Sequence, residues 1–452
     1  MLPIRLSNLA LEAFGNHLSN ILEKLATLSQ DTAIEIINCE YLDPVCRELE
    51  EMMQKTVPHT LADEITKNLT TDVLKTYNCF EKKLASRKQL SEVRVLSQQS
   101  CCYKQITAAL CSAILHPSVK EYTFSRFQFP EVKFLDAKIF VNCFLNVILK
   151  KLTNVQRLKL EIYEFDENVI LDNINVLKNM KEFTFFGCTD AIVRKVSETC
   201  KTLRILDLTN SEKITTISVK SILKLKYLEH LNIRWTSVLP HGIEQLIEGL
   251  KIRENINSLH TFQSLLLPHQ VELLSRYFPN LTSVELYFSE RFSLIPLKEL
   301  KMLSHLGIFF AVVQSYSSID LEEFLQSVGS RLRSIKLADF RENQFIDIFR
   351  IVAENCTVVE DLVLSAIPVH FREPEFSRIQ VADIPVLETV KYCELKVYHV
   401  ILVEAVLPKC VNVQVVKCCC KDRRFQPFVM KQLLIMRSGK LEQLCINNCL
   451  LK

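Results

Sequence analysis

Residues 203–208 read Leu203-Arg204-Ile205-Leu206-Asp207-Leu208, a phrase with apolar residues in its first, fourth and sixth places and mostly polar ones between them. Clear copies of this phrase start at Leu228, Leu281 and Leu441. Softer copies start at Val119, Val155, Met180, Ile256, Leu303, Leu332, Val359, Leu387 and Val413. Successive copies start 22 to 29 residues apart, with one interval of 36. A chain that repeats one short phrase at this period is expected to fold as a stack of similar coils.

The period is that of a leucine-rich repeat, in which a short strand sends its fourth and sixth residues into the core. The segments between copies have helical periodicity, for example Ile192, Val193 and Val196 after Asp190. We therefore predict an α/β leucine-rich-repeat solenoid, with a curved parallel sheet inside, helices outside and a helical cap at the N-terminus. Such a stack offers a long binding face and seldom a catalytic cleft.

The organisation along the chain changes near residue 112. Residues 1–112 have helical periodicity without the phrase, and residues 113–452 contain the phrase throughout. We expect the helical module of residues 1–112 to dock on the first coil of the solenoid, because an end coil without a cap exposes half of a hydrophobic layer.

The composition excludes several classes of function. The 452 residues have a formal net charge of only +3, which gives no strong field for the phosphates of nucleic acid. The seven glycines are too scattered to form a phosphate-binding loop. No local catalytic motif and no spaced His pair for a metal occurs, so we expect no enzyme activity, no cofactor and no metal site.

The seventeen cysteines are odd in number and scattered, and none forms a CxxC pair. This usage favours reduced thiols over a disulfide framework or a zinc site. Cys418, Cys419 and Cys420 are expected on one strand, where their side chains alternate between faces and do not converge on a metal. No secretory signal pattern and no stretch of 18 apolar residues occurs, so we expect a cytoplasmic or nuclear protein with no membrane partner.

Two segments near the N-terminus suggest partners. Leu6, Ala10 and Phe14 lie four residues apart on one helical face. This spacing resembles the elongin-binding segment of leucine-rich-repeat substrate receptors that carry a VHL-type box. The resemblance implies that these three residues bind an elongin adaptor.

A second segment contains Val57, Pro58, Leu61 and Ile65. It is similar to the cullin-contacting segment of the same receptors, and the resemblance implies a cullin as a further partner. The segment also looks like the opening of an F-box, which would instead bind a Skp-type adaptor. The F-box is the second choice, because its later tryptophan-containing phrase is missing. In the third alternative, these residues belong to ordinary capping helices.

The region around Cys188 and Cys200 resembles the cysteine-containing, RNI-like subtype of the repeat found in F-box proteins. Cys188 stands three places after the third apolar residue of its copy, where the family pattern has Asn or Cys. This resemblance implies a structural role for these cysteines.

The place directly after the third apolar residue is expected to face solvent on the side of a ligand. It is occupied by Arg234, by Phe262 in a slightly shifted register, and by Tyr287 and Phe309. Aromatic residues and arginine are enriched in binding hot spots. We predict that a protein substrate binds this column together with Glu285 and His305. The alternative is that the rings fold over the strand edge and pack on the loops.

The sequence thus predicts a non-catalytic substrate receptor of a cullin-type ubiquitin ligase. The competing prediction is a freestanding leucine-rich-repeat scaffold or inhibitor without a ubiquitin role. A secreted recognition ectodomain is the third choice, because no export signal is present and the cysteine count is odd.

Overall fold

The computed structural model describes residues 20, 42–71, 73–74, 107–125, 134–251, 261–288, 293–310, 318–367, 383–420 and 442–447. The chain divides into two compact units, Met1–Leu228 and Glu229–Lys452. The predicted boundary at residue 112 lies inside the first unit and stays a prediction.

The first unit contains a parallel sheet in which the strands follow chain order. Its strands are β1 (Glu121–Ser125), β2 (Arg157–Glu161), β3 (Glu182–Phe186) and β4 (Ile205–Asp207). Its helices are α3 (Asp43–Thr56), η2 (His59–Leu61), α6 (Phe134–Leu149), α7 (Glu167–Asn173), η4 (Ile174–Leu177), α8 (Asp190–Thr199), η5 (Thr216–Ser218) and α9 (Val219–Ile222). A further helix covers residues 62–71.

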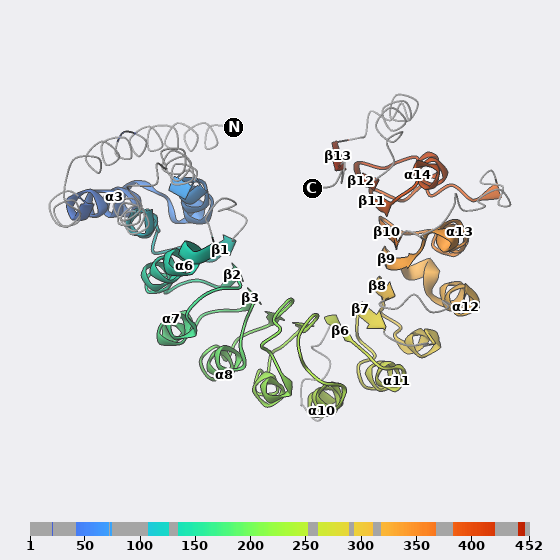
Figure 1. The fold of residues 1–452 in the computed structure, drawn as a ribbon, viewed down its shortest axis with the longest axis horizontal. Helices are drawn as coiled ribbons and strands as arrows, with labels where there is room; N and C mark the ends of the chain where they lie inside the picture. The colour runs from blue at the N-terminus through green and yellow to red at the C-terminus, as the bar shows by residue number, and fades with distance from the viewer. Residues whose placement is uncertain are drawn as a thin grey trace. The chain divides into compact units, whose positions relative to one another are not determined.

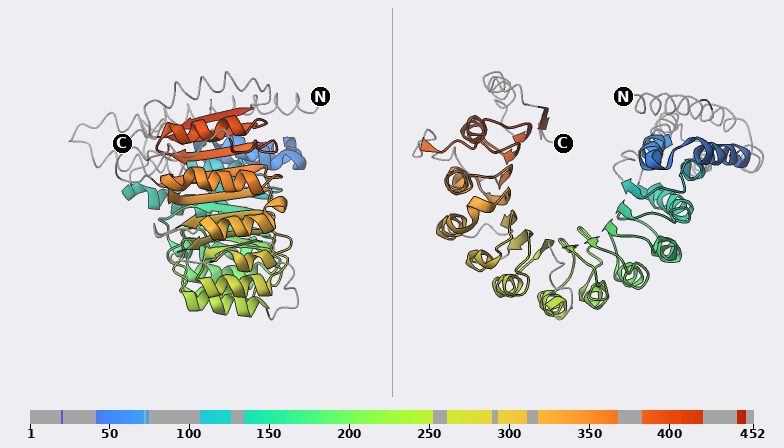
Figure 2. Two further views of the ribbon diagram at one scale, coloured as in Figure 1. Left: turned by 90° about the vertical axis from the view of Figure 1, so that its right-hand side faces the viewer. Right: turned by 180° about the vertical axis from the view of Figure 1, so that it is seen from behind.

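The second unit repeats the same arrangement with parallel strands in chain order. Its strands are β5 (His230–Asn232), β6 (Thr261–Leu265), β7 (Ser283–Phe288), β8 (His305–Phe310), β9 (Ser334–Arg341), β10 (Asp361–Ile367), β11 (Tyr392–Val397), β12 (Val415–Cys420) and β13 (Gln443–Asn447). Its helices are α10 (Pro240–Lys251), α11 (Pro268–Tyr277), η7 (Ile295–Glu299), α12 (Ser318–Val328), η8 (Gly329–Arg331), η9 (Glu342–Gln344), α13 (Phe345–Asn355), α14 (Val400–Val406) and η12 (Leu407–Lys409). Within this unit the strands line the inner side of a curve and the helices line its outer side (Figures 1 and 2).

The buried positions of the phrase explain this architecture. In β7, Val284 and Leu286 are fully buried beneath the helices, and Ser283 and Glu285, which alternate with them, point to the opposite face. Each coil therefore adds one strand to the sheet and one apolar layer to the core. The predicted α/β leucine-rich-repeat solenoid is confirmed.

Two of the softer copies were placed in the wrong register. Phe262 pairs with the fourth-place residues Leu231 and Val284, so the copy in this coil starts at Leu259 and not at Ile256. Cys393 pairs with Leu362 in the same way, which moves the next copy from Leu387 to residue 390. Apolar residues three apart generate overlapping copies of the phrase, and only pairing with the neighbouring strands selects one of them.

The first coil has a cap. In most of the other coils, the N–H group of the residue before the strand and that of the strand's first residue both donate to one carbonyl of the preceding coil, as Gln156 and Arg157 do to Lys120. No strand precedes β1 among the described residues, and the N–H groups of Lys120 and Glu121 donate instead to Oδ1 of Asp63, at 2.7 and 3.0 Å. The Asp63 carboxylate thus replaces the missing carbonyl. The expectation that the helical region caps the solenoid is confirmed at this contact.

A left-handed backbone recurs two places after the third apolar residue. It occurs at Gly187 (φ 85°), Asn210 (φ 58°), Trp235 (φ 57°) and Asp339 (φ 65°). Glycine, asparagine and aspartate adopt this conformation readily, but tryptophan does not. Among these four residues, Trp235 therefore has the highest steric cost in the left-handed conformation.

The cysteines serve packing. Cys188, Cys200 and Cys356 are fully buried in the core, and all the cysteines that the structure describes are free thiols. Burial raises the pKa of the Cys200 thiol to about 12, which keeps the thiol protonated and inert. In β12, Cys418 and Cys420 are buried and Cys419 between them lies on the opposite face, as predicted.

Candidate functional site

The second unit has one face of its sheet without helices among the described residues (Figure 2). We call this the helix-free face. It carries the side chains that alternate with the buried ones along each strand, and the strand register aligns them in rows across the sheet. One row contains the residues Asn232, Gln263, Glu285, Gly307, Lys336, Val363, Glu394 and Lys417.

Two aromatic rings stack on this face. Tyr287 of β7 and Phe309 of β8 are register partners, and their ring centroids lie 4.1 Å apart at an interplanar angle of 12°. Together with Ala338 they form a small buried cluster of their own, with only 5% of Tyr287 and 8% of Phe309 exposed. Trp235 meets Tyr287 edge-on, with centroids 5.1 Å apart, and remains 56% exposed.

Charged side chains cover the stacked rings. The guanidinium of Arg234 lies 5.3 Å from the centroid of Tyr287 and 5.7 Å from that of Phe309. Arg234 also donates through Nη1 to the carboxylate of Glu285. The ammonium of Lys336 lies 4.6 Å above Phe309 and 3.8 Å from the other carboxylate oxygen of Glu285. We call Arg234, Trp235, Glu285, Tyr287, Phe309 and Lys336 the Trp235 cluster.

Gly307 makes this arrangement possible. It lies between Glu285 and Lys336 in the row, because β8 separates β7 from β9. A Cβ atom at Gly307 would lie 2.6 Å from Cγ of Glu285, closer than side chains approach. The glycine therefore leaves the space that the Glu285 side chain occupies between the two cations.

Burial and mutual repulsion alter the ionisation of the cluster. Desolvation lowers the pKa of Lys336, and the nearby charges of Arg234 and Lys396 lower it further against the opposite effect of Glu285. Burial also raises the pKa of the Tyr287 hydroxyl, so this ring stays neutral. Arg234 is thus close enough to lower the pKa of Lys336, and both side chains pair with Glu285.

Four of the six predicted substrate-binding residues come together here: Arg234, Glu285, Tyr287 and Phe309. His305 lies on the same face of β8, is exposed and hydrogen-bonds to Ser304 through Nδ1 at 2.8 Å. The prediction for Phe262 was wrong. It is fully buried at the fourth place of its coil, on the helix side of the sheet, because the assumed register was three residues too early.

The alternative interpretation of the aromatic column is partly correct. Tyr287 and Phe309 are buried, but they pack on each other and beneath Arg234 instead of on the loops. The sequence reasoning missed Trp235 and Lys336. The available indication for Trp235 was that the chain's single tryptophan directly follows Arg234.

The predicted adaptor-binding residues fall into three groups. Val57 and Ile65 are buried within the chain, so their side chains offer no surface to a partner, and this part of the prediction is corrected. The reason is that residues 57–71 pack as the cap of the first coil. Pro58 is exposed and Leu61 is half-buried, which leaves them at the surface. The remaining three residues, Leu6, Ala10 and Phe14, lie outside the described residues.

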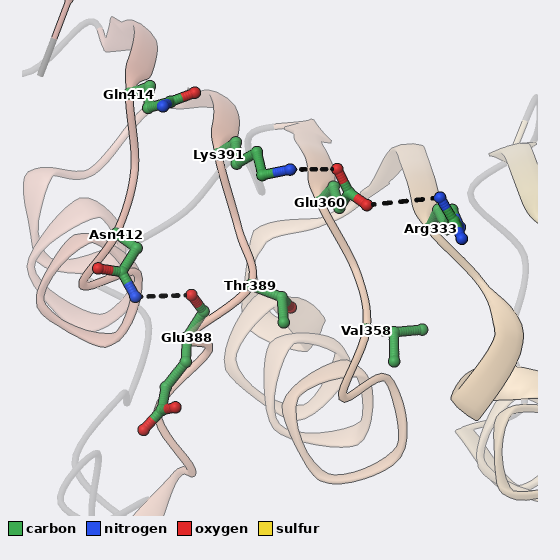
Figure 3. Close-up of a pocket in the computed structure, with 8 residues that line it drawn as sticks. All are labelled: Arg333, Val358, Glu360, Glu388, Thr389, Lys391, Asn412 and Gln414. Atoms are coloured by element: carbon green, nitrogen blue, oxygen red, sulfur yellow. Dashed lines mark hydrogen bonds and ion pairs between the residues drawn. The ribbon is translucent and has the colours of Figure 1, made fainter. Parts of the chain in front are cut away.

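A shallow pocket of about 510 Å³ lies at the turns that precede strands β9–β12 (Figure 3). The carboxylate of Glu360 lies between Lys391, at 2.7 Å, and Arg333, at 3.8 Å. Nδ2 of Asn412 donates to the carbonyl of Glu388 at 2.8 Å. These bonds join neighbouring coils, so the polar groups of this pocket stabilise the stack.

The described residues contain no group of three side chains suited to hold a metal ion. Among the same residues, no helix has the length and apolar character needed to cross a bilayer.

No family model matches the chain, and no curated protein sequence matches it. The fold is similar to the crystal structure of the Rad7 and Elc1 complex in yeast, with 12% sequence identity, a TM-score of 0.46 and 97% of each chain covered. The fold assignment rests on the parallel strand order and the buried phrase positions described above.

Proposed function

We propose that this chain is a non-catalytic protein-interaction module and that the helix-free face of its second unit captures a protein partner. The observation that carries the proposal is the Trp235 cluster. The exposed indole of Trp235 packs edge-on against the stacked rings of Tyr287 and Phe309. Charged side chains lie above those two rings. Tryptophan, tyrosine and arginine dominate binding hot spots.

Preorganisation supports this proposal. Tyr287 and Phe309 are held by each other, by Arg234 and by Lys336 before any partner arrives. A partner would therefore lose little affinity to the ordering of side chains.

We further propose that the captured protein is a substrate and that the chain serves a cullin-type ubiquitin ligase in the cytoplasm or nucleus. The resemblance of the N-terminal segments to a VHL-type box, with an F-box as the second form, supports this assignment. Pro58 and Leu61 are accessible for a contact with an adaptor or a cullin. The mechanism would be proximity, since the receptor holds the substrate close to the transfer machinery.

A freestanding scaffold or inhibitor is the second candidate. The burial of Val57 and Ile65 and the bonds from Asp63 to the first strand favour it. These contacts assign residues of the second box to the cap and not to a partner.

A photo-cross-linking pair tests the proposed face. A photoreactive amino acid replaces either Gln263, on the helix-free face of β6, or Gln326, on the exposed surface of α12. We expect one defined protein adduct in cells from position 263 and none from position 326. An adduct from position 326 alone, or equal adducts from both, would contradict the proposed face.

Adaptor binding tests the ligase assignment. Purified chain is mixed with an elongin adaptor or a Skp-type adaptor, with and without a cullin. Adaptor binding and cullin recruitment are measured for the wild type and for the variants L6D/A10D, L61D and T60D. We expect binding to elongin that L6D/A10D abolishes and that T60D, an exposed neighbour of Leu61, leaves intact. Loss of cullin recruitment with L61D would support a role for the second box. Binding to neither adaptor would leave the freestanding scaffold as the function.

A further inference from the structure

We propose that the Trp235 cluster binds a partner segment in which a large apolar side chain stands next to a carboxylate. The apolar side chain would lie on the indole of Trp235, and the carboxylate would lie between Arg234 and Lys336. This inference rests on the proposed protein-binding function and specifies the chemistry of the partner.

The first argument is the charge of the cluster. Arg234 and Lys336 both use the single carboxylate of Glu285. Two cations on one anion leave one positive charge above the stacked rings. Nε of Arg234 is buried without a hydrogen-bond partner, so Glu285 does not satisfy the guanidinium completely. A carboxylate from the partner would neutralise the remaining positive charge. The hydrogen bonds that it would accept are charge-assisted and therefore strong.

Further charged groups lie near Lys336. Lys396 of β11 is close enough to lower the pKa of Lys336, although Lys396 itself pairs with Glu394 at 2.9 Å. Burial raises the pKa of the Asp339 carboxyl group, and Lys396 and Lys336 act in the opposite direction. Arg234 directly precedes Trp235 in the chain and lies above the same Tyr287 ring that Trp235 contacts, so its charge lies next to the exposed indole.

The second argument is the indole. Trp235 keeps 56% of its surface exposed although its ring edge packs on Tyr287. Its left-handed backbone, φ 57°, is one that a bulky residue rarely adopts and that Asn210 adopts in an equivalent turn. A costly conformation that displays an apolar ring at a surface is typical of a functional site. An apolar side chain of the partner would bury the exposed part of this ring.

Aromatic rings and cations also bind single-stranded nucleic acid. The helix-free face favours a peptide, because Glu285, Asp361 and Glu394 lie among its cations and would repel a continuous phosphate backbone. The formal net charge of +3 provides no compensating field. A peptide offers its carboxylates singly and can match the one uncompensated site.

The chain's single tryptophan lies in the site, so its fluorescence reports occupancy directly. Full-length protein is titrated with a blocked short peptide in which Glu and Leu alternate. Matched peptides replace every Glu by Gln or every Leu by Ser, and an oligothymidylate serves as the nucleic-acid probe. We expect a saturable change in emission with the Glu–Leu peptide and at least about ten-fold weaker binding of both matched peptides.

Variants locate the carboxylate. K336Q should weaken binding of the Glu–Leu peptide about five-fold, and added salt should weaken binding to the wild type more than to K336Q. K220Q, which neutralises an exposed lysine on α9, is the control and should bind like the wild type. Circular dichroism checks that both variants are folded.

Equal binding of the Glu–Leu and Gln–Leu peptides, or no change in emission with either, would overturn the inference. A response to the oligothymidylate alone would also overturn it and assign nucleic acid to the cluster. If position 263 still cross-links a protein in either case, the proposed protein-binding face stands and only its assigned chemistry fails.

Discussion

Gly307 shows how one residue positions the Trp235 cluster. The variant G307A places a methyl group 2.6 Å from Cγ of Glu285, so the Glu285 side chain must move away from Arg234 or Lys336. We expect a loss of about 1–3 kcal/mol in the free energy of unfolding, which is the usual cost of overpacking. Urea denaturation measures it. In the double variant G307A/E285A the conflicting side chain is absent, and the added cost of G307A should largely disappear; an undiminished cost would contradict this geometry.

Asp63 is the corresponding residue at the cap. Its carboxylate accepts hydrogen bonds from the N–H groups of Lys120 and Glu121, where other coils use a backbone carbonyl of the preceding coil as the acceptor. We expect D63A to lower the free energy of unfolding by about 1–2 kcal/mol and to speed amide hydrogen exchange at Lys120 and Glu121. E64A changes an exposed neighbouring acid and should leave both quantities unchanged. Unaltered exchange at the two amides in D63A would show that the carboxylate is not the cap.

The role of a single residue in the Trp235 cluster or in the cap is hard to predict from a sequence. The positions of Arg234, Tyr287 and Phe309 follow from the phrase, because a strand alternates its side chains between two faces. Phe262 obeys the same rule, but the overlap of two possible phrases assigned it to the wrong face. The role of Trp235 depends on a left-handed turn and on Tyr287 in a different coil, and neither is readable from local spacing.

At the scale of the elements, side chains that bridge coils hold the stack together. Oγ of Ser211 accepts from the N–H groups of Gly187 and Cys188, at 3.1 and 3.0 Å, and donates to the carbonyl of Phe185 at 2.9 Å. S211A would remove the Oγ partner of the Cys188 N–H and of the Phe185 carbonyl, while the Gly187 N–H keeps its bond to the Asn210 carbonyl at 3.3 Å. The loss should cost about 2–3 kcal/mol in the free energy of unfolding. S221A, a serine of α9 that is nearly buried, serves as the control and should cost less. Urea denaturation compares the two, and equal small losses would contradict the bridging role.

The junction between the cap and the first coil should respond to pH. Burial, with a smaller contribution from the neighbouring ring of His59, lowers the pKa of His116 below its usual 6.5. Nδ1 of His116 accepts a hydrogen bond from the Ser118 N–H at 3.1 Å, which a protonated ring cannot do. The unfolded chain therefore binds the proton more readily than the folded one. The stabilisation is complete above about pH 6.5 and is lost as the pH falls through that value toward the folded-state pKa.

The measurement is the free energy of unfolding at about pH 7.5 and about pH 5.5. We expect the wild type to lose more stability on acidification than H116N, whose amide oxygen keeps an acceptor without a titrating proton. Equal losses in the two proteins would contradict this role of His116.

At the scale of the whole molecule, the repeated phrase was sufficient to predict parallel strands with helices on one side of the sheet. The resemblance to the cysteine-containing repeat implied a structural role for Cys188 and Cys200, and both are fully buried. The phrase could not predict which part of the face is used, because that depends on contacts across several coils. Arg234 reaches Glu285 across an intervening strand, and Glu285 reaches Lys336 across another.

The most direct test of the central claim is the affinity with which the W235N variant binds the protein that cross-links at position 263. Asparagine occupies the same turn position at Asn210 and adopts its left-handed backbone without strain, so the variant should fold as well as the wild type. I217N replaces another exposed apolar residue, in the first unit, and serves as the control. We predict that W235N weakens binding about 30-fold, as expected for a hot-spot tryptophan, and that I217N leaves it unchanged. Equal affinities of the wild type and W235N would contradict the claim that the Trp235 cluster is the centre of the protein-binding face.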